Sequence, residues 1–121
     1  MNFAATRITL GHDPRFPADV LKKLFEAIPN IVTKSLEIRE DSVVATTCES
    51  WNDCHRRRAN PHVEVWVETA KELGHKSDDW TYAVGRAVRT WLNDETGREH
   101  RPISCRIAVH VSQSQGSYSI W

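Results

Sequence analysis

The chain has 121 residues, of which 40% are hydrophobic and 26% are charged, and its 16 Lys and Arg residues balance 16 Asp and Glu residues. This length suits a single domain with its own hydrophobic core, and the ordinary composition argues against a disordered chain. Zero net charge argues against a dedicated binder of duplex nucleic acid, because such proteins usually carry a basic excess. We therefore expect one domain that spans residues 1–121.

The sequence also argues against a membrane protein or a secreted protein. No apolar run approaches the ~20 residues of a membrane span, and no signal peptide precedes Phe3. Three cysteines (Cys48, Cys54 and Cys105) form a sparse, odd set, which argues against a disulfide framework. These features predict a soluble cytoplasmic domain.

The first half of the chain predicts a strand, a helix and a second strand. Phe3–Leu10 alternates between two faces at the period of a strand, and Asp41–Cys48 is rich in Val and Thr. A helix begins near Pro17, whose missing N–H is tolerated in a first turn, and Pro29 is expected to kink or split it. The apolar stripe of this helix consists of Val20, Leu21, Leu24, Phe25, Ile28, Ile31, Val32 and Leu36.

The second half predicts the same order of elements after a polar, irregular segment. Asn60–Glu68 alternates strictly, with three valines on one face and His62, Glu64, Trp66 and Glu68 on the other. Ser77 is expected to cap a helix that Gly97 closes. Ile103–Val111 is the next predicted strand, and Tyr118–Trp121 is a short terminal one. The helical stripe consists of Trp80, Ala83, Val84, Ala87, Val88, Trp91 and Leu92.

Two strand–helix–strand units predict an α+β fold with a four-stranded mixed sheet and both helices on one face. The opposite face of the sheet is too polar for a dry core and too aromatic for simple exposure. We expect this face to surround a solvated channel in a ring of subunits. Its side chains would include Arg7, Glu64, Trp66, Arg106 and His110.

Four short motifs follow one another along the chain. They are Phe16-Pro17-Ala18-Asp19, the helix-to-strand junction Leu36–Val44, the strand start Asn60–Val65, and His100-Arg101-Pro102-Ile103 before the last long strand. In this order and spacing they resemble the tautomerase superfamily, which includes macrophage migration inhibitory factor. The resemblance covers nearly the whole chain and implies a homotrimer with three sheets around a channel and a terminal strand that reaches a neighbour.

The N-terminus departs from the pattern of this family. Its members use an N-terminal proline as general base or acid, whereas Asn2 follows Met1 in this chain. The family's catalytic residue therefore cannot be transferred, and the catalytic residues stay unknown. The resemblance does suggest a ligand site at Met1, Asn2 and Arg39, because Arg39 lies at the junction where the family often lines its pocket. A guanidinium there could hold a carboxylate in bidentate fashion, although positive charge at a helix C-terminus is favoured in any case.

Other residues suggest chemistry more weakly. Arg56, Arg57 and Arg58 could contact an acidic partner or nucleic acid, but a short basic run is more often a solvated loop. Cys48, Cys54, His55 and His62 lack the tight pairs of a structural zinc site, so we expect no metal. Cys54 beside His55 lacks a third, orienting group for nucleophilic catalysis.

The sequence thus supports two functions from different classes. The first is a tautomerase-like trimer that binds a small carboxylated or aromatic molecule between subunits, without a cofactor and with catalysis absent or altered. The alternative is a ferredoxin-like interaction module that uses Arg56–Arg58 on an acidic partner or nucleic acid.

Overall fold

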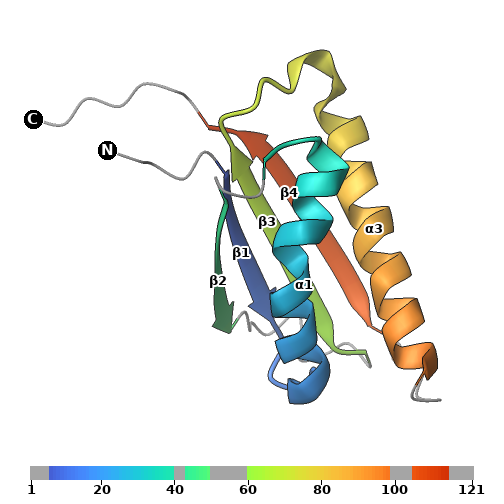
Figure 1. The fold of residues 1–121 in the computed structure, drawn as a ribbon. Helices are drawn as coiled ribbons and strands as arrows, with labels where there is room; N and C mark the ends of the chain where they lie inside the picture. The colour runs from blue at the N-terminus through green and yellow to red at the C-terminus, as the bar shows by residue number, and fades with distance from the viewer. Residues whose placement is uncertain (1–5, 40–42, 50–59, 99–104, 115–121) are drawn as a thin grey trace, which may run out of the picture.

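The computed structural model describes residues 6–39, 43–49, 60–98 and 105–114, and every structural statement below concerns these residues. They form four strands, two α-helices and a short 3-10 helix at Gly74–Lys76 (Figure 1). In chain order the main elements are β1 (Thr6–His12), α1 (Ala18–Leu36), β2 (Val43–Glu49), β3 (His62–Thr69), α3 (Ser77–Arg98) and β4 (Arg106–Gln113).

The four strands form one mixed sheet in the order β2-β1-β3-β4. β1 is parallel to β2, β3 is parallel to β4, and the two central strands are antiparallel. Each helix is therefore the crossover between two parallel neighbours, and both helices cover the same face (Figure 1). The predicted α+β architecture is confirmed.

The apolar stripes of both helices meet the alternating strands in a single core. Ile8 and Leu10 from β1 are completely buried, and so are Val63 and Val65 from β3. The predicted alternation is therefore confirmed on both central strands. The helices contribute the buried side chains of Val20, Leu24, Ile28, Val32, Leu36, Val84, Val88 and Leu92.

α1 corrects one expectation, because Pro29 does not split it. The helix continues without interruption from Ala18 to Leu36 across that residue. Ile28 and Val32, on either side of Pro29 along the stripe, are fully buried, and this tertiary packing compensates for the lost backbone hydrogen bond. The helix ends where Glu37 adopts a left-handed conformation with φ of 56°.

α3 corrects the expected caps. Ser77 has helical backbone angles and directly continues the 3-10 helix, so it is not an extended N-cap residue. Its carbonyl accepts a hydrogen bond from Thr81 Oγ1 at 2.9 Å. Gly97 lies within the last turn of the helix, which extends to Arg98. Trp80 and Trp91 are half-buried at the margin of the core rather than inside it.

The strands are displaced by a few residues from their predicted bounds. β1 extends past Leu10 because Gly11 and His12 pair with Glu64 and Val63. β4 begins at Arg106, later than the predicted Ile103, and extends to Gln113. The predicted terminal strand and the irregular segment 50–59 lie outside the described residues.

Candidate functional site

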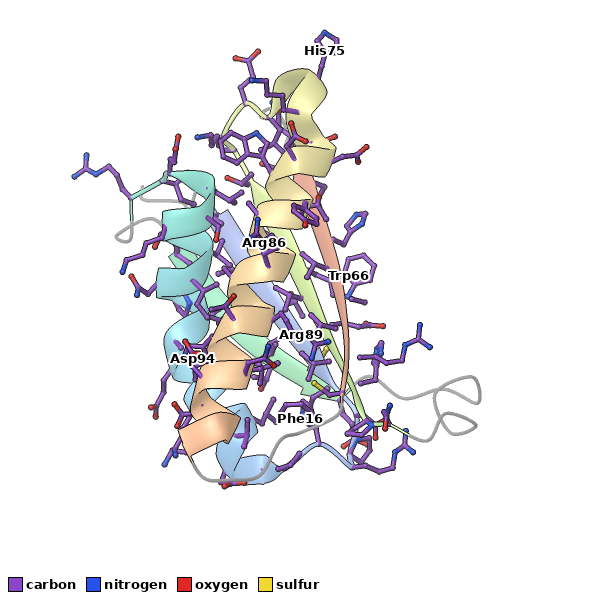
Figure 2. The ribbon with its side chains drawn as sticks, turned by 90° about the vertical axis from the view of Figure 1, so that its right-hand side faces the viewer. Phe16, Trp66, His75, Arg86, Arg89 and Asp94 are labelled. Carbon is purple, nitrogen blue, oxygen red and sulfur yellow. The ribbon has the colours of Figure 1, made fainter. Side chains whose placement is uncertain are left out.

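The face of the sheet that the helices leave uncovered carries the candidate site. We call it the open face; its side chains come from β1, β2, β3 and β4 and point away from the helices, as Trp66 does in Figure 2. Strand register brings Thr9, Trp66 and His110 into one row across three strands, and Arg7, Glu68 and Ser112 into the next row. The predicted placement of Arg7, Trp66 and His110 on one face is therefore confirmed.

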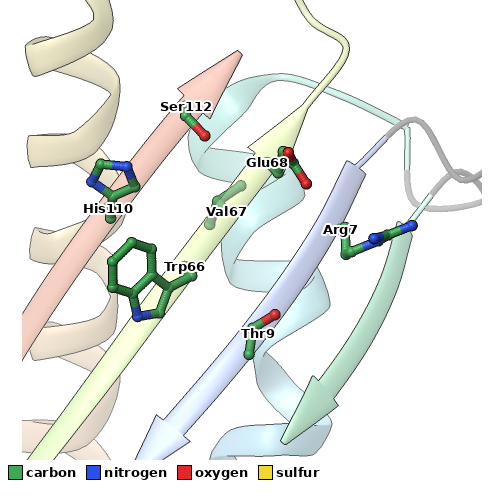
Figure 3. Close-up of a pocket in the computed structure, with 7 residues that line it drawn as sticks. All are labelled: Arg7, Thr9, Trp66, Val67, Glu68, His110 and Ser112. Atoms are coloured by element: carbon green, nitrogen blue, oxygen red, sulfur yellow. The ribbon is translucent and has the colours of Figure 1, made fainter. Parts of the chain in front are cut away.

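These rows surround a shallow hollow of about 270 Å³ (Figure 3). It combines one large aromatic ring with a guanidinium, a carboxylate, an imidazole and two hydroxyls. Such a mixture can bind a polar aromatic molecule or another protein surface. The lining residues are Arg7, Thr9, Trp66, Val67, Glu68, His110 and Ser112.

Trp66 is held in place from two sides although 48% of it is exposed. Its Nε1–H donates a hydrogen bond to Glu64 Oε2 at 3.1 Å. The His110 ring lies against it, with centroids 4.7 Å apart and planes at 48°. The single polar atom of the indole therefore already has a hydrogen-bond partner within the chain.

The same Glu64 carboxylate also binds His62. His62 Nε2 lies 2.7 Å from Glu64 Oε1, and because an ionised carboxylate can only accept, the imidazole donates. The His62 side chain is only 9% exposed, although strand alternation predicts it on the polar face. Sequence analysis missed the chain of contacts from His62 through Glu64 to Trp66. The pattern that could have predicted it is the placement of these three residues at every second position of one strand.

An ion pair between the buried Asp13 and the exposed Arg15 lies just after β1. The Asp13 side chain has no exposed surface, and Arg15 holds both of its oxygens, with Nη2–Oδ2 at 2.7 Å and Nε–Oδ1 at 3.1 Å. The Arg15 side-chain hydrogen bonds hold the pKa of Asp13 below its usual value, against the opposing effect of burial. Arg15 Nη2 also contacts the Asn60 carbonyl at 3.3 Å, so this pair joins the first loop to the start of β3. Sequence analysis missed it as well.

Arg39 is the member of the predicted ligand site that the structure describes. It is exposed beyond the C-terminal end of α1. Because Thr6 pairs with Val43, the chain segment after α1 lies at the same end of the sheet as the start of β1 (Figure 1). Met1 and Asn2 lie outside the described residues, so the grouping of these three residues stays a prediction.

The remaining predicted residues give no second site in the described part of the chain. Arg56, Arg57 and Arg58 lie outside it, together with Cys54 and His55. Cys48 is exposed on β2, and the described residues hold no cluster of three His, Cys, Asp or Glu side chains suited to a metal ion. Nor do these residues include a helix long and apolar enough to cross a membrane.

Cys105 is buried beside α3 as part of the hydrophobic core. Burial raises the pKa of its thiol, and the nearby Arg89 opposes that shift. Arg89 Nη2 donates a hydrogen bond to the Cys105 carbonyl at 3.0 Å, which ties α3 to the segment before β4. A buried thiol with a raised pKa is a poor nucleophile, so this cysteine is structural.

Solved structures with the same arrangement cover nearly the whole chain. A 5-carboxymethyl-2-hydroxymuconate isomerase from Deinococcus radiodurans R1 matches with a TM-score of 0.64 and 11% identity, over 98% of this chain and 92% of that one. Macrophage migration inhibitory factor from Toxoplasma gondii matches with a TM-score of 0.63 and 10% identity, over 94% and 95%. The chain has the tautomerase fold.

A third structure extends the likeness to another organism. A macrophage migration inhibitory factor-like protein from Entamoeba histolytica has a TM-score of 0.61 and 9% identity, over 95% of this chain and 96% of that one. No protein-family model matches the sequence, and no curated protein is significantly similar to it. At these identities the likeness establishes the tautomerase fold, while the chemistry must be argued from the residues of this chain.

Proposed function

We propose that this protein is a tautomerase-like homotrimer that binds a small carboxylated or aromatic molecule between its subunits, with catalysis absent or altered. The observation that carries the proposal is the tautomerase fold over nearly the whole chain, combined with an open face that leaves Trp66 half exposed. The resemblance implies the trimer, and the open face supplies a surface for it.

The polarity of the open face supports assembly around a solvated channel. Arg7, Glu68 and His110 are exposed on it beside Trp66, so this face cannot form a dry contact over its whole area. A ring of subunits lets the charged side chains stay hydrated while the tryptophan is covered. In a monomer, the Trp66 ring would stay half exposed to water.

Arg39 supports a carboxylate ligand. Its guanidinium can form two parallel hydrogen bonds with a carboxylate, and its position past α1 leaves it exposed near the end of the sheet where β1 starts. Met1 and Asn2 precede β1 in the chain, and we place them with Arg39 at the ligand site. Partners other than further copies of the chain and this ligand are not part of the proposal.

The N-terminal sequence supports weak or absent catalysis. Proton transfer at carbon needs a base whose pKa lies near the working pH and whose position is fixed. A proline amine is held in a rigid ring, whereas the amine of Met1 is a primary amine without such a ring, and Asn2 follows it. The pocket that binds the ligand therefore lacks the family's base.

Two measurements test the proposal. Light scattering should give three times the chain mass of 13.9 kDa, and a monomer at micromolar concentration would contradict the homotrimer. Calorimetric titration with phenylpyruvate, which carries an aromatic ring and a carboxylate, should detect binding that Arg39→Ala weakens about tenfold or more, since a hydrogen bond to a charged group is worth about 1.5–3 kcal/mol.

Lys34→Ala is the matched control for that titration. Lys34 is an exposed cation in the last turn of α1, close to Arg39 in the chain. Its removal should leave the affinity for phenylpyruvate unchanged. Equal losses in the two variants would show that general positive charge, and no specific site at Arg39, attracts the ligand.

A further inference from the structure

The exposed hydrophobic side chains of the described residues are concentrated on the open face. Three large ones are exposed, namely Val44 at 47%, Trp66 at 48% and Tyr82 at 67%. Val44 and Trp66 lie on the open face, on β2 and β3, whereas Tyr82 lies on α3. The open face therefore has two separate exposed apolar side chains, Val44 on the edge strand β2 and Trp66 on the central strand β3.

Opposite charges accompany these two points. Arg7 on β1 is paired in register with Val44 on β2, and Glu68 is two residues from Trp66 on β3. We call the side formed by β2 and β1 the basic half of the open face, and the side formed by β3 and β4 the acidic half. Each half thus carries one apolar anchor beside one exposed charge, and β4 adds the exposed Arg106 at the opposite end of the acidic half from Glu68.

Arg7 and Glu68 are direct neighbours across β1 and β3, yet no ion pair joins them. Opposite charges in this position usually attract one another, and among the described residues neither side chain has an ionic partner. Figure 3 shows Arg7 directed toward β2 and away from Glu68. Within the part of the chain that the structure describes, both charges are therefore available for an ion pair with another copy.

Trp66 is prepared for burial against a protein surface. Glu64 already satisfies its indole N–H, and His110 covers one side of the ring, which fixes its orientation before any contact forms. Covering the rest of the ring leaves no polar atom unpaired. A large aromatic ring with a fixed orientation is the kind of side chain that dominates interface energetics.

From these features we infer that the basic half of one copy's open face binds the acidic half of the next copy. Trp66 of one copy then contacts Val44 of the next, and Glu68 of the first pairs with Arg7 of the second. This inference rests on the homotrimer proposed above and specifies the contact that forms it. Because the two halves differ, the contact is head-to-tail, and a contact of this kind closes into a ring of three when each copy is rotated by a third of a turn from the last.

Charge reversal tests the inference on the full-length protein. Arg7→Glu and Glu68→Arg should each move the concentration at which the trimer dissociates upward by about tenfold or more, because like charges then face each other between copies. The double variant restores opposite charges and should return this concentration to near the wild-type value. Sedimentation velocity over a dilution series measures all four proteins.

The same substitutions also act within one chain, since Arg7 and Glu68 face each other across β1 and β3. Thermal unfolding, followed by circular dichroism under conditions where every variant is monomeric, measures that effect separately. A lower melting temperature with an unchanged mass at all concentrations would assign the charges to an intrachain role and overturn the inference. Lys34→Glu, a reversal on the helix layer, should leave the dissociation concentration unchanged.

Truncation of Trp66 tests the inference independently of the charges. Trp66→Ala should raise the dissociation concentration about tenfold or more, as hot-spot aromatic residues do. Tyr82→Ala removes a more exposed aromatic ring from α3 and should have no effect on assembly. A wild-type trimer that none of the open-face variants weakens would overturn this inference and leave the homotrimer standing, whereas a wild-type monomer would remove both.

Discussion

Trp66 and His110 lie side by side on neighbouring strands, with ring centroids 4.7 Å apart and planes tilted by 48°. Their backbones are paired in register across β3 and β4, so the sheet itself sets the separation of the two rings. Because Glu64 also holds the indole through its Nε1–H, the orientation of Trp66 depends on residues from two strands.

His110→Ala should lower the free energy of unfolding by about 0.5–1.5 kcal/mol, the usual contribution of an aromatic pair beyond its buried area. Urea unfolding at a concentration where the protein is monomeric measures this difference. His110→Phe keeps a ring against Trp66 and should recover most of the loss. If the alanine variant is as stable as wild type, the contact between the rings contributes nothing.

Stability in acid should depend on Asp13. The Arg15 hydrogen bonds lower the pKa of this carboxyl in the folded protein relative to its usual value of 3.8. The ionised carboxylate of Asp13 is therefore more stable in the folded protein than in the unfolded chain. The contribution of Asp13 to the free energy of unfolding is fully present above pH 3.8. It is lost as the pH falls below 3.8 through the folded-state pKa of Asp13.

Asp13→Asn should therefore be less stable than wild type at pH 7, and the difference should narrow as the pH falls below 3.8. Urea unfolding at several pH values between 7 and 2 measures it. Asp19→Asn is the matched control, because Asp19 is an exposed carboxyl in the first turn of α1. A difference between Asp13→Asn and wild type that stays constant to pH 2 would show that the carboxylate charge is not what stabilises this loop.

Adjacent residues of α3 should differ in their contribution to the core. Leu92 is 2% exposed and Trp91 is half-buried, although both belong to the same apolar stripe. Leu92→Ala should cost about 2–5 kcal/mol, as truncation of a buried leucine does, and Trp91→Ala should cost less than the about 3–5 kcal/mol of a fully buried aromatic. Denaturant unfolding of both variants decides this, and a larger loss for Trp91→Ala would place its ring deeper than the structure does.

Wild-type protein should show little or no interconversion of enol and keto forms of 2-keto acids. Loss of a well-placed general base typically reduces the rate by about 10²–10⁴. A variant that lacks Met1 and carries Asn2→Pro should regain weak turnover, since it presents a secondary amine at the N-terminus. The matched variant without Met1 and with Asn2→Ala should stay inactive. Robust wild-type turnover that neither change affects would place the chemistry at other residues.

Local periodicity was sufficient to predict the elements and the faces that they bury. Val63, Val65 and Val67 alternate with polar residues, and a strand places every second side chain on the same face whatever its neighbours are. The helical stripe from Val20 to Leu36 follows in the same way from the helical repeat. Two crossovers then restrict the sheet to few arrangements, so the α+β class and its open face could be predicted from the sequence.

Contacts between residues distant in sequence were decided only by the tertiary structure. Thr6 Oγ1 and Thr69 Oγ1 form a buried hydrogen bond of 2.9 Å, and Arg15 reaches the Asn60 carbonyl, yet no local pattern relates either pair. His62 follows the period of the polar face and is nevertheless buried, because its position at the start of β3 beside the Asp13 loop determines its surroundings. Periodicity specifies the direction of a side chain, whereas burial and hydrogen-bond partners depend on which segments the fold brings together.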